Sequence, residues 1–319
     1  MQDQSSLDHP DTPPFPDNEN GQPRRVGVEI EFTGLKVAET ARLVQQRLGG
    51  QVTESGSYRT AIESPEFGTF TVELDTQYAH AKGDGELERI LADAAGAVGE
   101  LFVPVEIVSP PLPYTRLQTM DKLVEDIRRH GAEGTGVGLF SAFGCHLNPE
   151  VASTDTAYIT ANLKAYLVLS AWLRHTINLD VTRQITPFVD PFPATYARRV
   201  VDPDYTPDQS QLIDDYMRDN PTRNRELDML PLFAFLDEER VRSHLDDPRI
   251  KARPTFHYRL PNSRVDEPHW TVTREWRRWL SVERLAADSD RLLAACRDFC
   301  NFHDQVIHIG WVNEAEKWA

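Results

Sequence analysis

Short stretches in which apolar and polar residues alternate are the clearest pattern in this chain. In residues 26–32, aliphatic or aromatic side chains occupy every second position, and Glu29 and Glu31 lie between them. Successive side chains of a β-strand point to opposite faces of a sheet. The pattern therefore predicts a strand with one apolar face and one face that carries two carboxylates.

The same alternation predicts further strands later in the chain. They are expected over residues 51–62, 68–75, 101–108, 137–148 and 255–260. Opposite their apolar sides these strands carry Glu73 and Asp75, then Glu106, then His146 and Asn148, and finally His257 and Arg259. Acidic and imidazole side chains therefore recur on the polar faces of strands that are far apart in the chain.

Helical periodicity, with apolar residues three and four positions apart, predicts the remaining regular structure. Helices are expected over residues 36–48, 86–91, 116–130, 157–177, 237–245 and most of 272–318. The chain is therefore expected to contain both helices and strands.

Two segments lack either periodicity. Residues 1–23 are polar and rich in proline, and they predict a disordered N-terminal tail ahead of a single domain over residues 24–319. Residues 187–224 are rich in Pro and Asp and interrupt that domain. A loop of this length usually forms a functional lid or an insertion.

Composition narrows the class of protein. The chain has 319 residues, 40% of them hydrophobic, and a formal net charge of −16. This acidic balance argues against sequence-independent nucleic-acid binding, which requires Lys and Arg to neutralise phosphates. No apolar run reaches the length of a membrane span, no signal peptide is evident, and three cysteines do not indicate a disulfide framework. We therefore expect a cytoplasmic protein with no membrane or nucleic-acid partner.

The polar strand faces admit two interpretations. A sheet covered on one side by helices often has a solvated polar face, and on that interpretation the carboxylates point to water. The second interpretation is a metal site, because carboxylates and imidazoles bind Mg²⁺ or Mn²⁺ and because clustered like charges require a counter-ion. The number of carboxylates on these faces favours the metal site.

Four motifs, in this order, resemble the putative amidoligase family. They are Gly-Val-Glu-Ile-Glu-Phe at 27–32, Phe-Thr-Val-Glu-Leu-Asp at 70–75, Val-Glu-Ile-Val-Ser-Pro-Pro-Leu at 105–112 and Gly-Cys-His-Leu-Asn at 144–148. That family is a branch of the glutamine synthetase and glutamate–cysteine ligase superfamily of carboxylate–amine ligases. The resemblance implies an amidoligase-like catalytic domain over residues 24–319 with an α+β fold. Its curved antiparallel sheet is expected to have helices packed on the convex face and a polar concave catalytic face that holds ATP and Mg²⁺, or Mn²⁺.

The resemblance also implies roles for individual residues. Metal ligands are expected at Glu29, Glu31, Glu106, His146 and His257, with Glu31 and Glu106 on one ion and Glu29 and His146 on another. Catalytic residues are expected at Arg259, Arg264 and Asp75, and ATP or substrate anions are expected at Arg259 and Arg223. The implied reaction joins a small-molecule or peptide carboxylate to an amine through an acyl phosphate.

The chain departs from the family pattern at three positions. His257 stands where relatives commonly have a metal-binding Glu, Asn148 where they often have His, and Asp228 where Asn is more usual. Two other functions therefore remain open, namely a hydrolase that uses a metal-bound water and a non-catalytic member that binds a nucleotide or a peptide. The sequence identifies neither the substrates nor the oligomeric state.

Overall fold

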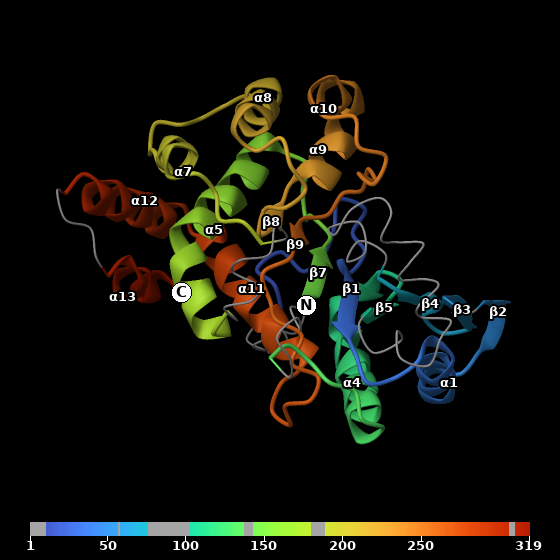
Figure 1. Ribbon diagram of the computed structural model, residues 1–319. Coiled ribbons are helices and arrows are strands. Elements are labelled where there is room, and N and C mark those ends of the chain that lie inside the picture. The colour runs from blue at the N-terminus through green and yellow to red at the C-terminus, as the bar shows by residue number, and fades with distance from the viewer. Residues whose placement is uncertain (1–10, 57, 76–102, 137–142, 180–188, 306–309) are drawn as a thin grey trace, which may run out of the picture. The chain divides into compact units, whose positions relative to one another are not determined.

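The computed structural model describes residues 11–56, 58–75, 103–136, 143–179, 189–305 and 310–319 (Figure 1). The chain divides into two compact units. The sheet unit comprises residues 25–147 and 261–274, and the helical unit comprises residues 1–24, 148–260 and 275–319. Each unit is described by itself.

A sheet forms the centre of the sheet unit. Its strands are β1 (Arg25–Phe32), β2 (Gln51–Ser55), β3 (Arg59–Ser64), β4 (Gly68–Leu74), β5 (Val105–Val108), β6 (Leu112–Pro113) and β7 (Cys145–Pro149). The last two residues of β7 belong to the helical unit. The strand order is β2-β3-β4-β5-β1-β7, and β6 pairs with the start of β1. The pairings β2–β3, β3–β4, β4–β5, β5–β1 and β1–β6 are all antiparallel, and β2 lies at an open edge.

Two helices cover the apolar side of this sheet. Helix α1 (Val37–Leu48) packs on β3 and β4 and against α4 (Gln118–Arg129), which follows the short 3₁₀ helix η3 (Tyr114–Arg116) (Figure 1). The four apolar side chains of β1 are fully buried, as are those that α4 presents at helical spacing. Because alternate strand residues face opposite ways, this packing leaves Glu29, Glu31 and Glu106 on the other side of the sheet.

Helix α5 (Thr156–Ile177) is the central element of the helical unit. The helices in contact with it are α7 (Ala194–Val201), α8 (Gln209–Asp219), α12 (Ser289–His303), α13 (Trp311–Ala315) and the 3₁₀ helix η4 (Glu316–Trp318). Helix α10 (Glu238–His244) packs on α8 and on α9 (Leu230–Leu236). Twelve of the 22 residues of α5 are buried, so it is the core helix that its apolar sequence predicts.

Two short strands of the helical unit carry Asp228 and His257. Strands β8 (Leu227–Asp228) and β9 (His257–Tyr258) pair antiparallel, with Asp228 opposite His257. The Tyr258 ring lies 6.0 Å from the Tyr166 ring of α5 and 5.4 Å from the Trp279 ring of α11 (Val272–Ala287). Strand β9 is therefore held between α5 and α11 by aromatic packing.

The architecture confirms the predicted α+β class and the mostly antiparallel sheet. The predicted strand over residues 51–62 is in fact two strands, β2 and β3, and the last strand is shorter than the predicted 255–260. The predicted loop over residues 187–224 contains the helices α7 and α8. The helix predicted over residues 86–91 lies outside the described residues.

The segment predicted as a disordered tail makes specific contacts from residue 11 onward. The Trp276 indole donates to the backbone oxygen of Asp11, and the Phe15 ring lies 6.0 Å from the Tyr158 ring. Arg24 donates to both oxygens of Glu283, at 2.7 and 2.6 Å, and both side chains are almost fully buried. These contacts fix residues 11–24 on the helical unit.

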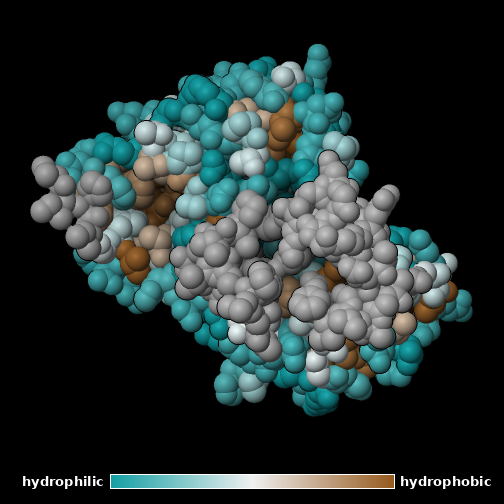
Figure 2. Space-filling model, viewed as in Figure 1, coloured by the Kyte–Doolittle hydropathy of each residue, from teal (hydrophilic) through white to brown (hydrophobic). Residues whose placement is uncertain are grey.

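The described surface is mainly hydrophilic. In the face that Figure 2 shows, hydrophobic residues form small separate areas between hydrophilic ones. The exposed large hydrophobic residues of the described segments are Phe15, Val52, Tyr58, Phe235 and Leu293. Within those segments, no helix combines the length and the apolar character that crossing a membrane requires.

Candidate functional site

Strand register places three carboxylates next to one another on the polar face of the sheet unit. Glu31 of β1 is directly opposite Glu106 of β5, and Glu106 is also opposite Glu73 of β4. Side chains at directly opposed positions have Cβ atoms about 4.5–5.5 Å apart. The Glu31 and Glu106 residues are each only 8% exposed, so solvent does little to screen their charges.

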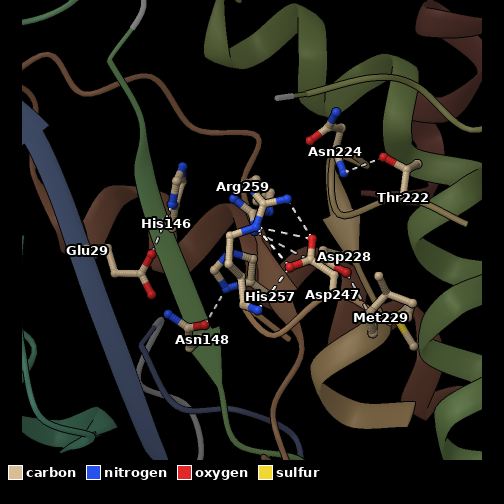
Figure 3. Close-up of polar contacts among 12 residues, drawn as sticks. Glu29, His146, Asn148, Thr222, Asn224, Asp228, Met229, Asp247, His257 and Arg259 are labelled. Atoms are coloured by element: carbon tan, nitrogen blue, oxygen red, sulfur yellow. Dashed lines mark hydrogen bonds and ion pairs between the residues drawn. The ribbon is translucent and has the colours of Figure 1, made fainter. Parts of the chain in front are cut away.

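His146 of β7 completes this group. Its Nδ1 lies 3.1 Å from Glu29 Oε2 (Figure 3). Its Nε2 lies 3.7 Å from Glu31 Oε1. Because an ionised carboxylate only accepts hydrogen bonds, Nδ1 carries the proton and donates a hydrogen bond to Glu29. The other oxygen of Glu31 accepts a 2.8 Å hydrogen bond from the backbone N–H of Gly144.

The charges of this group need a counter-ion. Burial raises the pKa of Glu106 well above its ordinary value, and the negative charges of Glu29, Asp75, Glu31 and Glu73 raise it further. Ligand atoms of Glu31, Glu106 and His146 all lie within 4.8 Å of one another. Two carboxylate oxygens and an imidazole nitrogen form a donor set that suits Mg²⁺ or, better, Mn²⁺. The residues therefore fit a divalent cation.

The structure brings the members of each predicted ligand pair together. The sequence assigned Glu31 and Glu106 to one ion and Glu29 and His146 to another. Glu31 and Glu106 lie in one candidate group, which His146 also joins, and Glu29 contacts the Nδ1 atom of His146. A carboxylate in that position orients a histidine ligand from outside the coordination sphere.

Two predicted catalytic residues also belong to the sheet unit. Asp75 directly follows β4, where its backbone N–H donates to Pro104 at 2.9 Å, and it is 8% exposed. Its charge is one of those that raise the pKa of Glu106. Arg264 donates to Glu267 Oε1 at 2.6 Å. Asp75 is thus close enough to the carboxylate group to act on it electrostatically.

The helical unit holds the other predicted anion-binding residues. Arg259 is 5% exposed and forms an ion pair with the buried Asp228, with Nη2 and Oδ2 3.3 Å apart (Figure 3). Burial lowers the pKa of Arg223, and so does the neighbouring positive charge of Arg259. Among the residues that the structure describes, none accepts a hydrogen bond from the Arg223 guanidinium. Two adjacent, poorly solvated guanidinium groups are suited to binding an anion.

His257, the last predicted metal ligand, also belongs to the helical unit. Its Nδ1 lies 2.5 Å from Asn148 Oδ1 (Figure 3). Arg253 Nη2 lies 2.8 Å from the same oxygen. Both Asn148 and His257 are buried. The sequence analysis did not find Arg253, because it lies in a proline-containing segment without periodicity, four residues before His257.

Comparison with known proteins identifies the family of this chain. The family model described as "Putative amidoligase enzyme" matches residues 22–281. Comparison with curated proteins and with solved structures gave no match. The matched range includes both groups of residues described above and most of the chain. The chain therefore belongs to the putative amidoligase enzyme family.

Proposed function

We propose that this protein is an ATP-dependent carboxylate–amine ligase with a glutamine synthetase-like fold. Membership of the amidoligase family supports the formation of a carbon–nitrogen bond. The observation that carries the proposal is the group Glu31, Glu106 and His146, because a cluster of buried carboxylates suits the divalent cation that accompanies ATP. The reaction would consume a carboxylate, an amine and ATP, and would release an amide, ADP and phosphate.

Glu31, Glu106 and His146 would hold Mg²⁺ or Mn²⁺. When bound, the cation would neutralise phosphate oxygens, which is the main requirement of phosphoryl transfer. Glu29 would keep His146 in the tautomer whose Nε2 carries the lone pair. The backbone N–H of Gly144 would hold one Glu31 oxygen in place and so orient that carboxylate.

Arg259 and Arg223 would bind the anionic oxygens of a phosphate group or of the substrate carboxylate. A guanidinium group presents parallel N–H donors that match two oxygens at once. Asp228 fixes Arg259, and no described side chain accepts a hydrogen bond from the Arg223 guanidinium. Arg264 is the third arginine of this proposal. It now donates to Glu267, and it would bind a substrate anion if that anion replaced Glu267 as its partner.

The chemical steps follow from the substrates. An oxygen of the substrate carboxylate would attack the γ-phosphorus of ATP, and ADP would leave. The amine nitrogen would then attack the carbonyl carbon of the acyl phosphate, and phosphate would leave with the electron pair of the broken C–O bond. Asp75 would accept the proton that the amine loses, because its carboxylate lies beside the acidic group.

The proposal is tested by incubating the purified chain with ATP, Mg²⁺ and pools of carboxylic acids and amines. We expect release of ADP and phosphate that requires one acid and one amine. Glu31→Gln should abolish this release, whereas Glu66→Gln, which changes an exposed carboxylate paired with Arg116, should not. Turnover without nucleotide would instead indicate the hydrolase. Binding of ATP without turnover of any pool would indicate the non-catalytic member.

A further inference from the structure

Three buried or partly buried side chains of the helical unit, those of Asn148, Arg253 and His257, all lie within hydrogen-bonding distance of one another. Asn148 Oδ1 lies 2.5 Å from His257 Nδ1 and 2.8 Å from Arg253 Nη2, and the two nitrogens lie 3.1 Å apart. No assignment of the protons gives all three close pairs a donor and an acceptor. The favoured assignment is therefore the one whose mismatched pair is the longest of the three contacts.

Arg253 constrains the assignment first, because a guanidinium group can only donate hydrogen bonds. The Asn148 atom 2.8 Å from it must therefore be the amide oxygen and not the amide nitrogen. The flipped amide would place two donors against each other at that distance. Asn148 Oδ1 is thus an acceptor for both of its neighbours.

The same reasoning then fixes His257. If Nδ1 carried the lone pair, it would face Asn148 Oδ1, another acceptor, at 2.5 Å. If Nδ1 carries the proton, this shortest contact becomes a hydrogen bond, and the contact between two donors is the longest of the three, at 3.1 Å. The protonated Nδ1 is therefore the assignment that the distances support.

We propose that Arg253 and Asn148 are positioning residues that set His257 in the Nδ1–H tautomer, so that Nε2 is its ligand atom. The use of Nε2 toward a divalent cation rests on the proposed function together with the metal-ligand role that the family resemblance implies for His257, whereas the tautomer does not. Histidine ligands are commonly fixed in this way by an acceptor on the second ring nitrogen.

The tautomer can be measured by ¹⁵N NMR on the full chain labelled at histidine, at a mildly alkaline pH where imidazoles are neutral. His257→Gln assigns its signals. We expect a protonated nitrogen at Nδ1 and an unprotonated nitrogen at Nε2. Exposed His175 and His269 are the internal reference for solvated rings. A wild-type His257 that is protonated at Nε2 would overturn the proposal.

Matched variants test the two positioning residues. Asn148→Asp retains an acceptor oxygen and should keep the Nδ1–H tautomer. Asn148→Leu removes the acceptor and should shift the population toward Nε2–H. Arg253→Met removes the donor that fixes the amide and should have the same direction of effect, whereas Arg253→Lys should have less. Unchanged His257 signals in both Asn148→Leu and Arg253→Met would contradict the proposal.

Mn²⁺ alone tests the ligand atom. We expect paramagnetic broadening of the His257 Nε2 signal at Mn²⁺ concentrations that leave His175 sharp. A sharp His257 signal at Mn²⁺ saturation would exclude Nε2 as a ligand atom, even if the tautomer is as proposed. Failure of the ligase assay with a broadened His257 signal would instead count against the proposed reaction alone.

Discussion

At the scale of single residues, Glu106 is expected to make the stability of the metal-free protein depend on pH. Its pKa is raised by burial and by four neighbouring carboxylates. Between the ordinary carboxyl pKa and this raised pKa, the unfolded chain is ionised at this position while the folded chain still holds the proton. The unfolded state then binds fewer protons, so the free energy of unfolding falls as pH rises through that window.

Glu106→Gln should remove this penalty. At neutral pH without divalent cations, we expect the variant to unfold at a higher temperature than the wild type. With saturating Mn²⁺ the order should reverse, because the variant loses a ligand. Thermal unfolding with and without Mn²⁺ measures both effects.

The control for Glu106→Gln is Glu63→Gln, which changes an exposed carboxylate on strand β3 of the same sheet. It should shift neither the metal-free unfolding temperature nor the response to Mn²⁺. If Glu106→Gln destabilises the metal-free protein at neutral pH, the assignment of an uncompensated charge at Glu106 is wrong.

Glu29→Gln tests the orienting role of Glu29. The amide can still accept a hydrogen bond from His146 Nδ1, but it lacks the negative charge that makes the imidazole a better ligand. We expect the affinity for Mn²⁺ to fall about 10- to 100-fold, as for other outer-shell substitutions. Isothermal titration gives the affinity. An affinity equal to that of wild type would exclude a role for Glu29 in the metal site.

The sequence predicts these site residues only in part. Alternation within β1 and β5 is a local property, so the faces of Glu31 and Glu106 could be predicted. That Glu31 pairs directly with Glu106 depends on the register between strands more than 70 positions apart in the sequence. No local pattern encodes that register, and the grouping of His146 with Glu31 and Glu106 was missed for the same reason.

At the scale of elements, composition predicted a loop over residues 187–224 where the structure has the helices α7 and α8, because the residues at helix ends resemble those of loops. Pro193 immediately precedes α7, and the Asp208 side chain accepts a hydrogen bond from the backbone of Gln211 at the start of α8. Proline and aspartate are favoured at helix starts as well as in loops. Long helices with clear periodicity, such as α4 and α5, could be predicted, because many buried positions define their apolar face.

The N-terminal segment provides a prediction at this scale. Arg24→Met removes one partner of a buried ion pair and leaves Glu283 without its cation. Breaking such a pair commonly costs about 3–5 kcal/mol. We expect a loss of that size in the free energy of unfolding, measured with denaturant, and faster proteolysis within residues 11–23.

The matched substitution is Arg129→Met, which breaks an ion pair between exposed side chains on α4. Exposed pairs contribute only about 0.2–1 kcal/mol. Equal effects of the two substitutions would show that Arg24 does not hold the N-terminal segment.

At the scale of the whole molecule, a cation bound by the folded chain alone should raise its stability with concentration. For one site, the gain reaches about 2.7 kcal/mol when the free cation is 100 times its dissociation constant. We expect this dependence on Mn²⁺ for the wild type and none for a variant with both Glu31→Gln and Glu106→Gln. An equal gain for the two proteins would place the cation elsewhere.

The central claim is that Glu31, Glu106 and His146 bind a divalent cation. Anomalous diffraction from crystals soaked with Mn²⁺ and a non-hydrolysable ATP analogue tests it most directly. The account predicts an anomalous peak at coordination distance from a Glu31 oxygen, a Glu106 oxygen and His146 Nε2. Crystals with ordered Mn²⁺ at other positions and none beside these three side chains would contradict it.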